Sequence, residues 1–273
     1  MQRSHAHGRW GYMRLGEKIV FLTEADSVSG RAIIRRLSSE GASFILNSAS
    51  GGVAIREETD RCRASGRKAF VANIDTSNRD EVERMLDTAS REIGEPDILV
   101  HNNDLTEPGT IEHGSEEWFR RLIDHNAKSA FICTQAVGGR MARRNRGRIV
   151  FVSSIHAEKP TGSSFPYSAA KGAVKMLTRE AALRLGRCGV TVNAIEFGPV
   201  EGDDERFRSD LSLLYEHYRT KVPNAVLGTH DDLAEVVLFL ASDESRYVNG
   251  ADIRVDGGFL MHYIDAKMKQ AAD

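Results

Sequence analysis

The sequence predicts a single α/β domain built on a doubly wound parallel sheet of about seven strands, with helices on both faces. Short, continuous apolar runs alternate with longer amphipathic segments, which is typical of strands buried on both faces and joined by right-handed helical crossovers. A chain of 273 residues, with 41% hydrophobic and 28% charged residues, also suits one large domain with a full core rather than two domains.

The elements follow one another in regular order along the chain. Apolar runs predict strands at 18–22, 43–47, 68–73, 97–101, 148–153, 190–195 and 251–256. Amphipathic segments predict helices at 29–39, 52–65, 78–93, 115–143, 166–186 and 230–241. We place the domain at 14–259, between a disordered extension at 1–13 and a tail at 260–273.

Composition excludes several classes of partner and site. A net charge of -2 gives no basic stripe for a nucleic acid, and no apolar run approaches the length of a membrane span. The polar first residues lack the apolar core of a signal peptide. Cys62, Cys133 and Cys188 have no C-x-x-C spacing, so neither a disulfide framework nor a metal site is expected. These features together predict a cytoplasmic protein.

The fold class itself predicts where a ligand binds. In an open parallel sheet the binding crevice lies beyond the carboxyl ends of the strands, where the strand order reverses. The residues that end the apolar runs are therefore expected to face one crevice: Thr23, Ser48, Asp75, Asn102, Ser154 and the segment 196–200.

The residues after the fifth predicted strand carry a family resemblance. Ser154 precedes Tyr167 by thirteen positions, and the spacing in "YSAAK" places Tyr167 and Lys171 one turn apart on the same face of a helix. The segments "DILVHNN", "DHNAKSAFICTQAV" and "VTVNAIEFGPV" agree with the same pattern. From about residue 15 to 258 the chain resembles the short-chain dehydrogenase/reductase family, whose fold is of the Rossmann type.

This resemblance implies a catalytic set of Asn126, Ser154, Tyr167 and Lys171. Tyr167 is then the general acid and base that interconverts a secondary alcohol and a ketone, and a lysine ammonium one turn away is expected to lower the pKa of its phenol. Ser154 is expected to hydrogen-bond the substrate oxygen, and Asn126 to hold a water against the lysine. With Ser154 and Tyr167, His156 and Phe197 are expected to border the substrate.

The resemblance also implies NAD or NADP as cofactor. The residues expected to bind it are Thr23, Ser27, Ser29, Gly30, Ser48, Asp75, Asn102, Tyr167, Lys171, Gly198 and Val200. Ser48 stands where an acid would bind the ribose hydroxyls of NAD, and Ala49 stands where an arginine would meet the 2′-phosphate of NADP. The sequence therefore leaves the choice of cofactor open.

The cofactor side departs from the family pattern, while the catalytic side is intact. Where the family has T-G-x-x-x-G-x-G, the chain has "TEADSVSG", so Glu24 and Val28 replace two glycines. Val28 brings a branched side chain to a position of close approach and is poorly suited to a positive φ. Glu24 and Asp104, which follows "HNN", bring carboxylates toward the cofactor. At about 5 Å and an effective dielectric near 20, one such charge repels a phosphate by roughly 3 kcal/mol.

Three functions are compatible with these features. The first is an NAD(P)-dependent oxidoreductase. The others are an enzyme of the same fold that uses Ser154 and Tyr167 for non-redox acid-base chemistry without a nucleotide, and a non-catalytic binding subunit. The family places a substrate lid at about 200–223, and its members pair the helices at 115–143 and 166–186, so a homodimer or homotetramer is expected. The substrate itself is expected to be a small alcohol or ketone.

Overall fold

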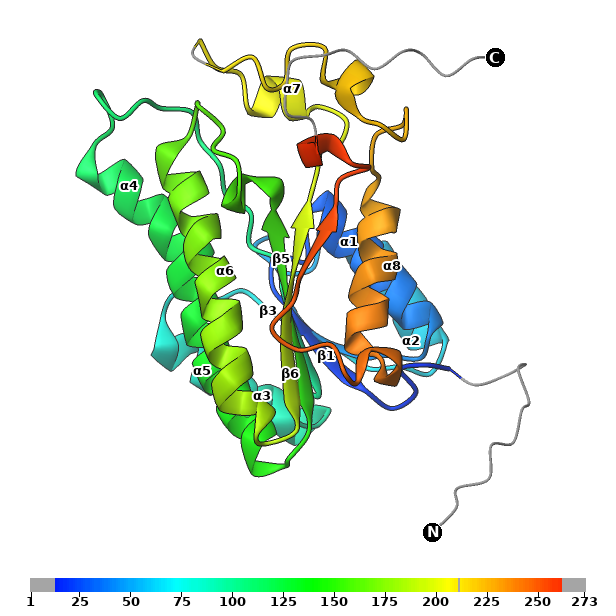
Figure 1. The fold of residues 1–273 in the computed structure, drawn as a ribbon. Coiled ribbons are helices and arrows are strands. Elements are labelled where there is room, and N and C mark those ends of the chain that lie inside the picture. Colours follow the sequence, from blue (N-terminus) through cyan, green and yellow to red (C-terminus); the bar gives the residue numbers. More distant parts are fainter. Residues whose placement is uncertain (1–12, 211, 262–273) are drawn as a thin grey trace.

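The structure is a computed structural model, and it describes residues 13–210 and 212–261. Its centre is a seven-stranded parallel sheet with the order β3-β2-β1-β4-β5-β6-β7 (Figure 1). The strands are β1 (Ile19–Leu22), β2 (Ser43–Asn47), β3 (Ala69–Ala72), β4 (Ile98–His101), β5 (Gly147–Ser154), β6 (Val190–Phe197) and β7 (Asp252–Val255). The chain runs outward from β1 to β3 and returns to β4 beside β1, so the strand order reverses between β1 and β4. This is the predicted Rossmann-type doubly wound fold.

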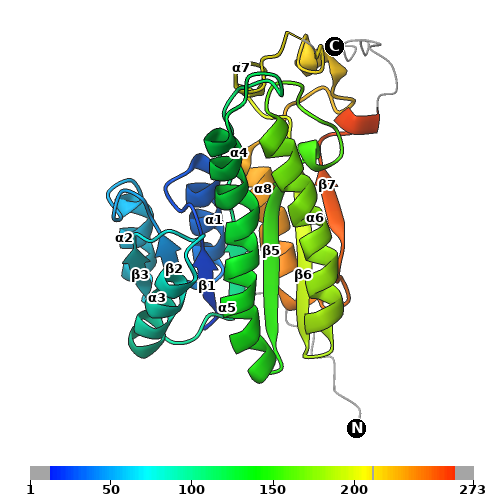
Figure 2. The same ribbon diagram turned by 90° about the vertical axis from the view of Figure 1, so that its left-hand side faces the viewer.

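Helices cover both faces of the sheet: Figure 1 shows them on either side of the strands, and Figure 2 looks onto one face. One layer contains α1 (Val28–Ser39), α2 (Arg56–Ala64) and α8 (His230–Ala241). The other contains α3 (Arg79–Glu92), α5 (Ser129–Arg143) and α6 (Phe165–Gly186). The helix α4 (Glu116–Ile123) continues into α5 through a π-helical turn at Asp124–Lys128, and the short α7 (Asp203–Arg206) lies in the lid.

The two helical layers bury two separate apolar cores, one on each face of the sheet. Val20 and Leu22 point into the first core, and Phe21 points into the second. Because successive strand residues point to opposite faces, a strand with both faces covered must be apolar at every position. This is why β1 and its neighbours read as continuous apolar runs.

The predicted elements agree with the structure except at their ends. β5 and β6 run one and two residues beyond the predicted ends, so Ser154 and Phe197 still belong to the sheet. The single predicted helix at 115–143 is interrupted by the π-helical turn, which contains Asn126. Met13 accepts a hydrogen bond from the Gly16 amide, so it belongs to the folded part. The rest of the predicted extension and most of the predicted tail lie outside the described residues.

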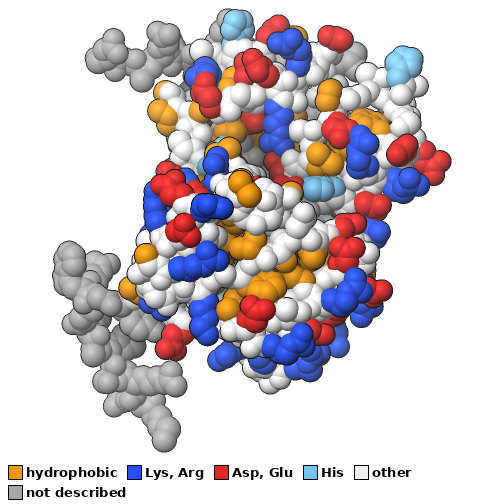
Figure 3. All heavy atoms as spheres, turned by 180° about the vertical axis from the view of Figure 1, so that it is seen from behind, with side chains coloured by type: hydrophobic (Ala, Val, Ile, Leu, Met, Phe, Trp, Pro, Cys, Tyr) orange, Lys and Arg blue, Asp and Glu red, His pale blue; other side chains and the backbone are white. Residues whose placement is uncertain are grey.

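The surface carries no continuous field of one charge on the face that Figure 3 shows, where acidic and basic side chains are mixed. This agrees with the net charge of -2. Within the described ranges, none of the helices has the length and apolar character needed to cross a bilayer.

Candidate active site

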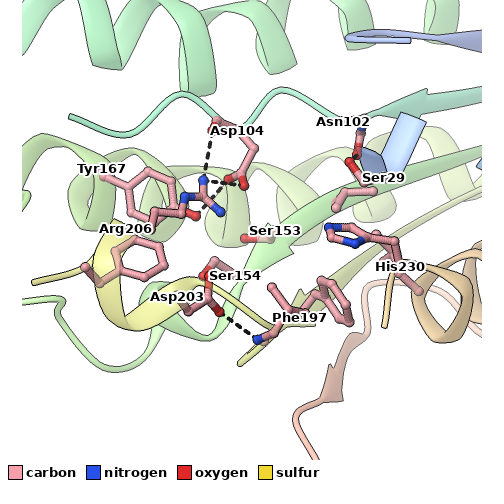
Figure 4. Close-up of a pocket in the computed structure, with 15 residues that line it drawn as sticks. Ser29, Asn102, Asp104, Ser153, Ser154, Tyr167, Phe197, Asp203, Arg206 and His230 are labelled. Carbon is pink, nitrogen blue, oxygen red and sulfur yellow. Dashed lines mark hydrogen bonds and ion pairs between the residues drawn. The ribbon is translucent and has the colours of Figure 1, made fainter. Parts of the chain in front are cut away.

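Two cavities open beyond the carboxyl ends of the strands. The outer cavity lies against the ends of β1, β2 and β3 and has a volume of about 320 Å³; Asp26, Ala49, Asp75 and His125 are among its lining residues. The inner cavity lies between β4, β5, β6 and the lid and has a volume of about 40 Å³. Its lining includes Asp104, Ser154, Tyr167 and Arg206 (Figure 4). The predicted crevice is therefore divided into a roomy half and a nearly filled half.

The predicted serine, tyrosine and lysine come together at the inner cavity. Tyr167 and Lys171 project from one face of the first turns of α6, and both are buried. Ser154 ends β5 beside them. Pro166 lies in the first turn of α6, where its fixed φ and missing amide hydrogen suit a helix start. The helix start and the end of the strand therefore fix the three side chains relative to one another.

Asp104 occupies the centre of this group. The Tyr167 hydroxyl donates a hydrogen bond of 2.7 Å to Asp104 Oδ1, and the Lys171 ammonium lies 2.9 Å from the same oxygen. Lys171 also donates to the carbonyl of Asn103 at 2.9 Å. The Asp104 carboxylate thus accepts from the Tyr167 hydroxyl, which is predicted to bind the substrate, and pairs with the Lys171 ammonium, which is predicted to bind the cofactor.

The other carboxylate oxygen of Asp104 is held by the lid. Arg206, at the end of α7, donates to Asp104 Oδ2 at 2.6 Å and to the Asp104 carbonyl at 2.9 Å. Burial opposes ionisation of Asp104, but the charges of Lys171 and Arg206 outweigh it and hold its pKa well below the usual range. Asp104 is therefore a charged bridge between α6 and the lid (Figure 4).

The acidity of Tyr167 differs from the prediction made from its spacing to Lys171. Burial, followed by the charge of Asp104, raises the pKa of the Tyr167 phenol well above its ordinary value. The positive charge of Arg206 and the Ser154 hydroxyl act in the opposite direction without reversing the shift. In this arrangement Tyr167 is a protonated hydrogen-bond donor.

Asn126 lies near this group but is fully engaged with the backbone. Its amide nitrogen donates to the carbonyls of Leu105 and Leu122 at 2.8 and 2.9 Å, and its oxygen accepts from the Leu105 amide at 3.1 Å. The side chain therefore fastens the loop after β4, the loop that carries Asp104. Its role in holding a water against Lys171 stays a prediction.

Of the two remaining substrate predictions, Phe197 lines the inner cavity and His156 anchors the lid behind it. The His156 ring is buried and lies 2.8 Å from the Lys159 carbonyl through Nδ1 and 2.8 Å from the Tyr215 hydroxyl through Nε2. Because a carbonyl only accepts, Nδ1 carries the proton and Nε2 accepts from Tyr215. Burial lowers the pKa of His156 to about 4.

In the turn after β1, the residue with a positive φ is not the one for which the sequence raised this question. Glu24, rather than Val28, adopts a positive φ, of 47°. Val28 begins α1 and its side chain is 56% exposed, so it causes no backbone strain. The Glu24 carboxylate pairs with His125 and accepts a hydrogen bond from the Asp104 amide at 3.1 Å. Glu24 therefore spans the crevice between β1 and β4.

The predicted phosphate-binding residues form their own network at the start of α1. Ser27 caps the helix by accepting from the Gly30 amide at 3.0 Å. The Asn102 side chain donates a hydrogen bond to Ser27 and accepts one from Ser29, and the backbone amide of Asn102 donates to Thr23 Oγ1. Gly30 packs so tightly that a β-carbon there would lie 2.4 Å from the Glu24 carbonyl oxygen. The helix N-terminus remains a site where an anion is favoured.

Asp26 is a candidate cofactor-binding residue that was not predicted from the sequence. Ser48 donates to Asp26 Oδ1 at 2.6 Å, and the Ser50 amide donates to Oδ2 at 2.7 Å. Asp26 therefore brings a carboxylate to the end of β2, where Ser48 had left the position without an acid. The signal in the sequence is the acid of the "TEAD" turn, which lies after the first strand, whereas the family resemblance places such an acid at the end of the second strand, where this chain has Ser48.

Three further predicted cofactor residues lie at opposite ends of the crevice. Asp75 lines the outer cavity. Gly198 and Val200 line the inner cavity, where the Val200 amide donates to Asp203 Oδ2 at 2.8 Å.

Arg206 is the second site residue that was not predicted from the sequence, where it is only one of several charges in the lid.

The two halves of the crevice fit a dinucleotide unequally. The outer cavity has the volume of a small ligand pocket and presents the Asp26 carboxylate toward the place of a ribose diol. The inner cavity has room for about one or two waters. A nicotinamide ring fits there only when Asp104 and Arg206 have moved.

Comparison with known proteins agrees with this architecture. The sequence model of a family described as enoyl-(acyl carrier protein) reductase matches residues 25–260. The chain is 32% identical to the 3-oxoacyl-(acyl carrier protein) reductase of Staphylococcus aureus, over 89% of this chain and 98% of that protein. It is 31% identical to an L-rhamnose 1-dehydrogenase (NAD(P)(+)) of Azotobacter vinelandii, over 92% and 99% of the two chains.

Solved structures give the same result. A short-chain type dehydrogenase/reductase of Mycobacterium marinum superposes with a TM-score of 0.80 at 25% identity, over 91% of this chain and 97% of that one. Levodione reductase superposes with a TM-score of 0.82 at 25% identity, over 92% and 100% of the two chains. Fold, sequence and the positions of Ser154, Tyr167 and Lys171 therefore agree that the chain belongs to the short-chain dehydrogenase/reductase family of oxidoreductases.

Proposed function

We propose that the protein is a cytoplasmic NAD-dependent oxidoreductase that interconverts a secondary alcohol and a ketone, with Tyr167 as general acid and base. The observation that carries the proposal is the convergence of Ser154 and Tyr167 on the inner cavity beyond the carboxyl ends of the strands, with Lys171 beside them on Asp104. The relatives named above are oxidoreductases, which favours redox chemistry over the non-redox and non-catalytic alternatives.

The proton chemistry follows from the donors at the inner cavity. When an alcohol is oxidised, its hydroxyl proton passes to Tyr167, and its carbinol hydrogen leaves with two electrons. Ser154 and Tyr167 hold the substrate oxygen, so charge that develops on it meets donors already in position. The nicotinamide cofactor supplies the acceptor of the hydride, or its donor in the reverse direction, and Lys171 is placed to contact its ribose.

Catalysis requires Asp104 to leave Tyr167. A carboxylate bonded to the phenol stabilises the protonated form, so Tyr167 cannot accept a proton while that bond persists. Once Asp104 withdraws, the ammonium of Lys171 becomes the nearest charge and favours the phenolate. The active form therefore differs from the described arrangement at Asp104, which gives up its contacts with Tyr167 and Arg206.

Asp26 favours NAD over NADP. Its carboxylate is fixed by Ser48 and Ser50 at the end of β2, where it can accept hydrogen bonds from a ribose diol. A 2′-phosphate at the same place would meet a like charge. At about 4 Å and an effective dielectric near 20 the repulsion is roughly 4 kcal/mol, less with solvent screening, which predicts a preference of about a hundredfold.

We further propose that the protein is a homodimer or homotetramer. The exposed apolar side chains of α5 and α6 include Phe131, Met176 and Leu183, which are 50%, 54% and 74% exposed. Phe119 of α4 stacks on Phe165 of α6 at their outer ends. Such side chains are typical of a helical face that pairs with a second copy, and sedimentation equilibrium measures the resulting mass directly.

The decisive experiment combines cofactor binding with turnover. Wild type is expected to bind NADH, as followed by nicotinamide fluorescence, and to reduce members of a ketone panel. Tyr167→Phe is expected to lower turnover by a hundredfold or more while NADH still binds. Tyr247→Phe is the matched control, since Tyr247 is 95% exposed and far from the cavity residues in the chain. Full activity of Tyr167→Phe, or turnover without any nucleotide, contradicts the proposal.

A further inference from the structure

Arg206 is a partly buried cation, with a side chain that is 32% exposed, and its partner is a carboxylate of the protein itself. Its guanidinium lies 4.9 Å from the ring centroid of Phe207 and 5.7 Å from that of Tyr167, so two aromatic rings cover part of it. Burial lowers the pKa of Arg206, but the charge of Asp104 outweighs it and raises that pKa above the ordinary value. A guanidinium in such surroundings needs an anionic partner.

The carboxylate of Asp104 shows what this group of donors accepts. One oxygen receives the Tyr167 hydroxyl, and the other receives Arg206. Tyr167 is also the residue proposed to hold the substrate oxygen. A ligand that replaces Asp104 must therefore present two oxygens close together, one to Tyr167 and one to Arg206.

We propose that the substrate is a 2-oxo acid or the corresponding 2-hydroxy acid, whose carboxylate binds Arg206 while its reacting oxygen binds Tyr167 and Ser154. This inference rests on the proposed function and specifies the substrate class of the same site. In a 2-oxo acid the ketone and carboxylate carbons are adjacent, so their oxygens can lie nearly as close as the two oxygens of Asp104. In a 3-oxo acid an additional carbon separates them.

A second feature of the same cavity fits an incoming carboxylate. Ser153 lines the inner cavity and is 5% exposed, and its hydroxyl has no hydrogen-bond partner among the described residues. A buried hydroxyl without a partner is costly. Figure 4 places Ser153 between Asp104 and Ser154, within the same group of side chains. The hydroxyl is therefore available for the second oxygen of a bound carboxylate.

The binding step is an exchange of one carboxylate for another. The substrate takes the place of Asp104 on Tyr167 and Arg206, and Asp104 withdraws, which leaves the Lys171 ammonium to favour the phenolate. A neutral ketone displaces Asp104 from Tyr167 but offers Arg206 no anion in return. The site therefore discriminates against neutral ketones by leaving the partly buried Arg206 without an anionic partner.

The test compares benzoylformate with its methyl ester, in the presence of NADH. The two compounds share the ketone and a phenyl ring that suits the aromatic wall formed by Tyr167 and Phe207. Wild type is expected to favour the acid in kcat/KM by about ten- to a hundredfold, the effect of one charge-assisted hydrogen bond. Arg206→Gln is expected to reduce this acid-to-ester ratio by at least tenfold. Arg208→Gln changes the lid charge equally at an exposed position and is expected to keep the ratio.

Calorimetric titration with oxalate provides a readout that needs no turnover. Oxalate is expected to bind wild type and Arg208→Gln, and to bind Arg206→Gln at least tenfold more weakly. If the protein turns over neither compound and binds no NADH, the proposed function fails, while Arg206-dependent oxalate binding still supports the anion site. Equal kcat/KM for acid and ester in wild type, or oxalate binding unaffected by Arg206→Gln, overturns the inference. If Arg206→Gln does not fold, Arg206→Lys replaces it, and the wild-type ratio together with competition by oxalate decides.

Discussion

The two halves of the crevice differ in what their polar side chains contact: in the outer half they leave a cavity open, and in the inner half they fill the cavity by contacting one another. The outer cavity is open at about 320 Å³, and its Asp26 carboxylate is fixed by Ser48 and Ser50 without filling the space. The inner cavity, at about 40 Å³, is filled by groups that satisfy one another. Asp104 meets Tyr167, Lys171 and Arg206 there. One half is preformed for a ligand, whereas the other must exchange an internal ligand for an external one.

This difference teaches that an intact catalytic set does not by itself make a site ready. When a ligand must break internal contacts to bind, its apparent dissociation constant is the intrinsic dissociation constant divided by the fraction of protein molecules in which the site is already open. The structure assigns that cost to the inner half and to the lid that closes it. The predictions that follow separate the two halves.

The largest expected effect is the loss of stability of the closed lid in acid. Burial lowers the pKa of His156 to about 4, below the ordinary value near 6.5, so the folded protein favours the neutral ring. Its contribution is complete above about pH 6.5, falls as the pH drops from about 6.5 toward 4, and is lost below about 4. The shift corresponds to at most about 3 kcal/mol. Protonation also removes the acceptor for the Tyr215 hydroxyl and should loosen the lid.

Chemical unfolding of wild type and His156→Gln at pH 7 and pH 4.5 measures this effect. The variant is expected to lose distinctly less stability over this interval, because glutamine does not titrate. Parallel pH dependence in the two proteins means that His156 does not contribute.

Next in size is the cofactor preference set in the outer half. Asp26→Ser is expected to reduce the ratio of the NADPH dissociation constant to the NADH dissociation constant by at least tenfold, because the charge that faces a 2′-phosphate is removed. Fluorescence titrations with NADH and NADPH give the ratio. Asp75→Asn is the matched control, since it removes another carboxylate of the same cavity. An unchanged ratio in Asp26→Ser would place cofactor discrimination elsewhere.

The smallest effect is expected at Glu24, which borders both halves. Glu24→Gly removes a carboxylate from the phosphate path and suits the positive φ, so NADH affinity should rise about fivefold. Stability should change by no more than about 1 kcal/mol, since relief of strain offsets the loss of the partly exposed contact between Glu24 and His125. His125→Gln leaves the carboxylate unpaired and should weaken NADH binding. Weaker binding of NADH to Glu24→Gly contradicts this assignment.

The sequence predicted the fold well, for identifiable reasons. Strands covered on both faces must be apolar at every position, so β1, β4 and β5 were visible as runs. The four-residue spacing of Tyr167 and Lys171 is a property of one helix and does not depend on distant parts of the chain. Local patterns of this kind determine which side chains share a face.

The internal contacts of the site could not be predicted in the same way. Arg206 meets Asp104 across 102 positions of sequence, through a lid whose path depends on packing by Phe207 and Tyr215. The expectation that Lys171 lowers the pKa of Tyr167 considered only this pair, whereas burial and Asp104 decide the direction. The positive φ fell on Glu24 rather than Val28, because α1 begins one residue earlier than predicted and includes Val28 in its first turn.

The most direct test of whether Asp104 closes the inner half compares AMP, which is part of the dinucleotide, with complete NADH. Wild type and Asp104→Gly are titrated with AMP, which needs the outer half, and with NADH, which needs both. The account predicts that AMP binds the two proteins equally within about twofold, while NADH binds Asp104→Gly at least tenfold more tightly because no internal carboxylate has to be displaced. Equal NADH affinity in the two proteins, or an equal gain for AMP and NADH, would contradict the claim that Asp104 closes the inner half.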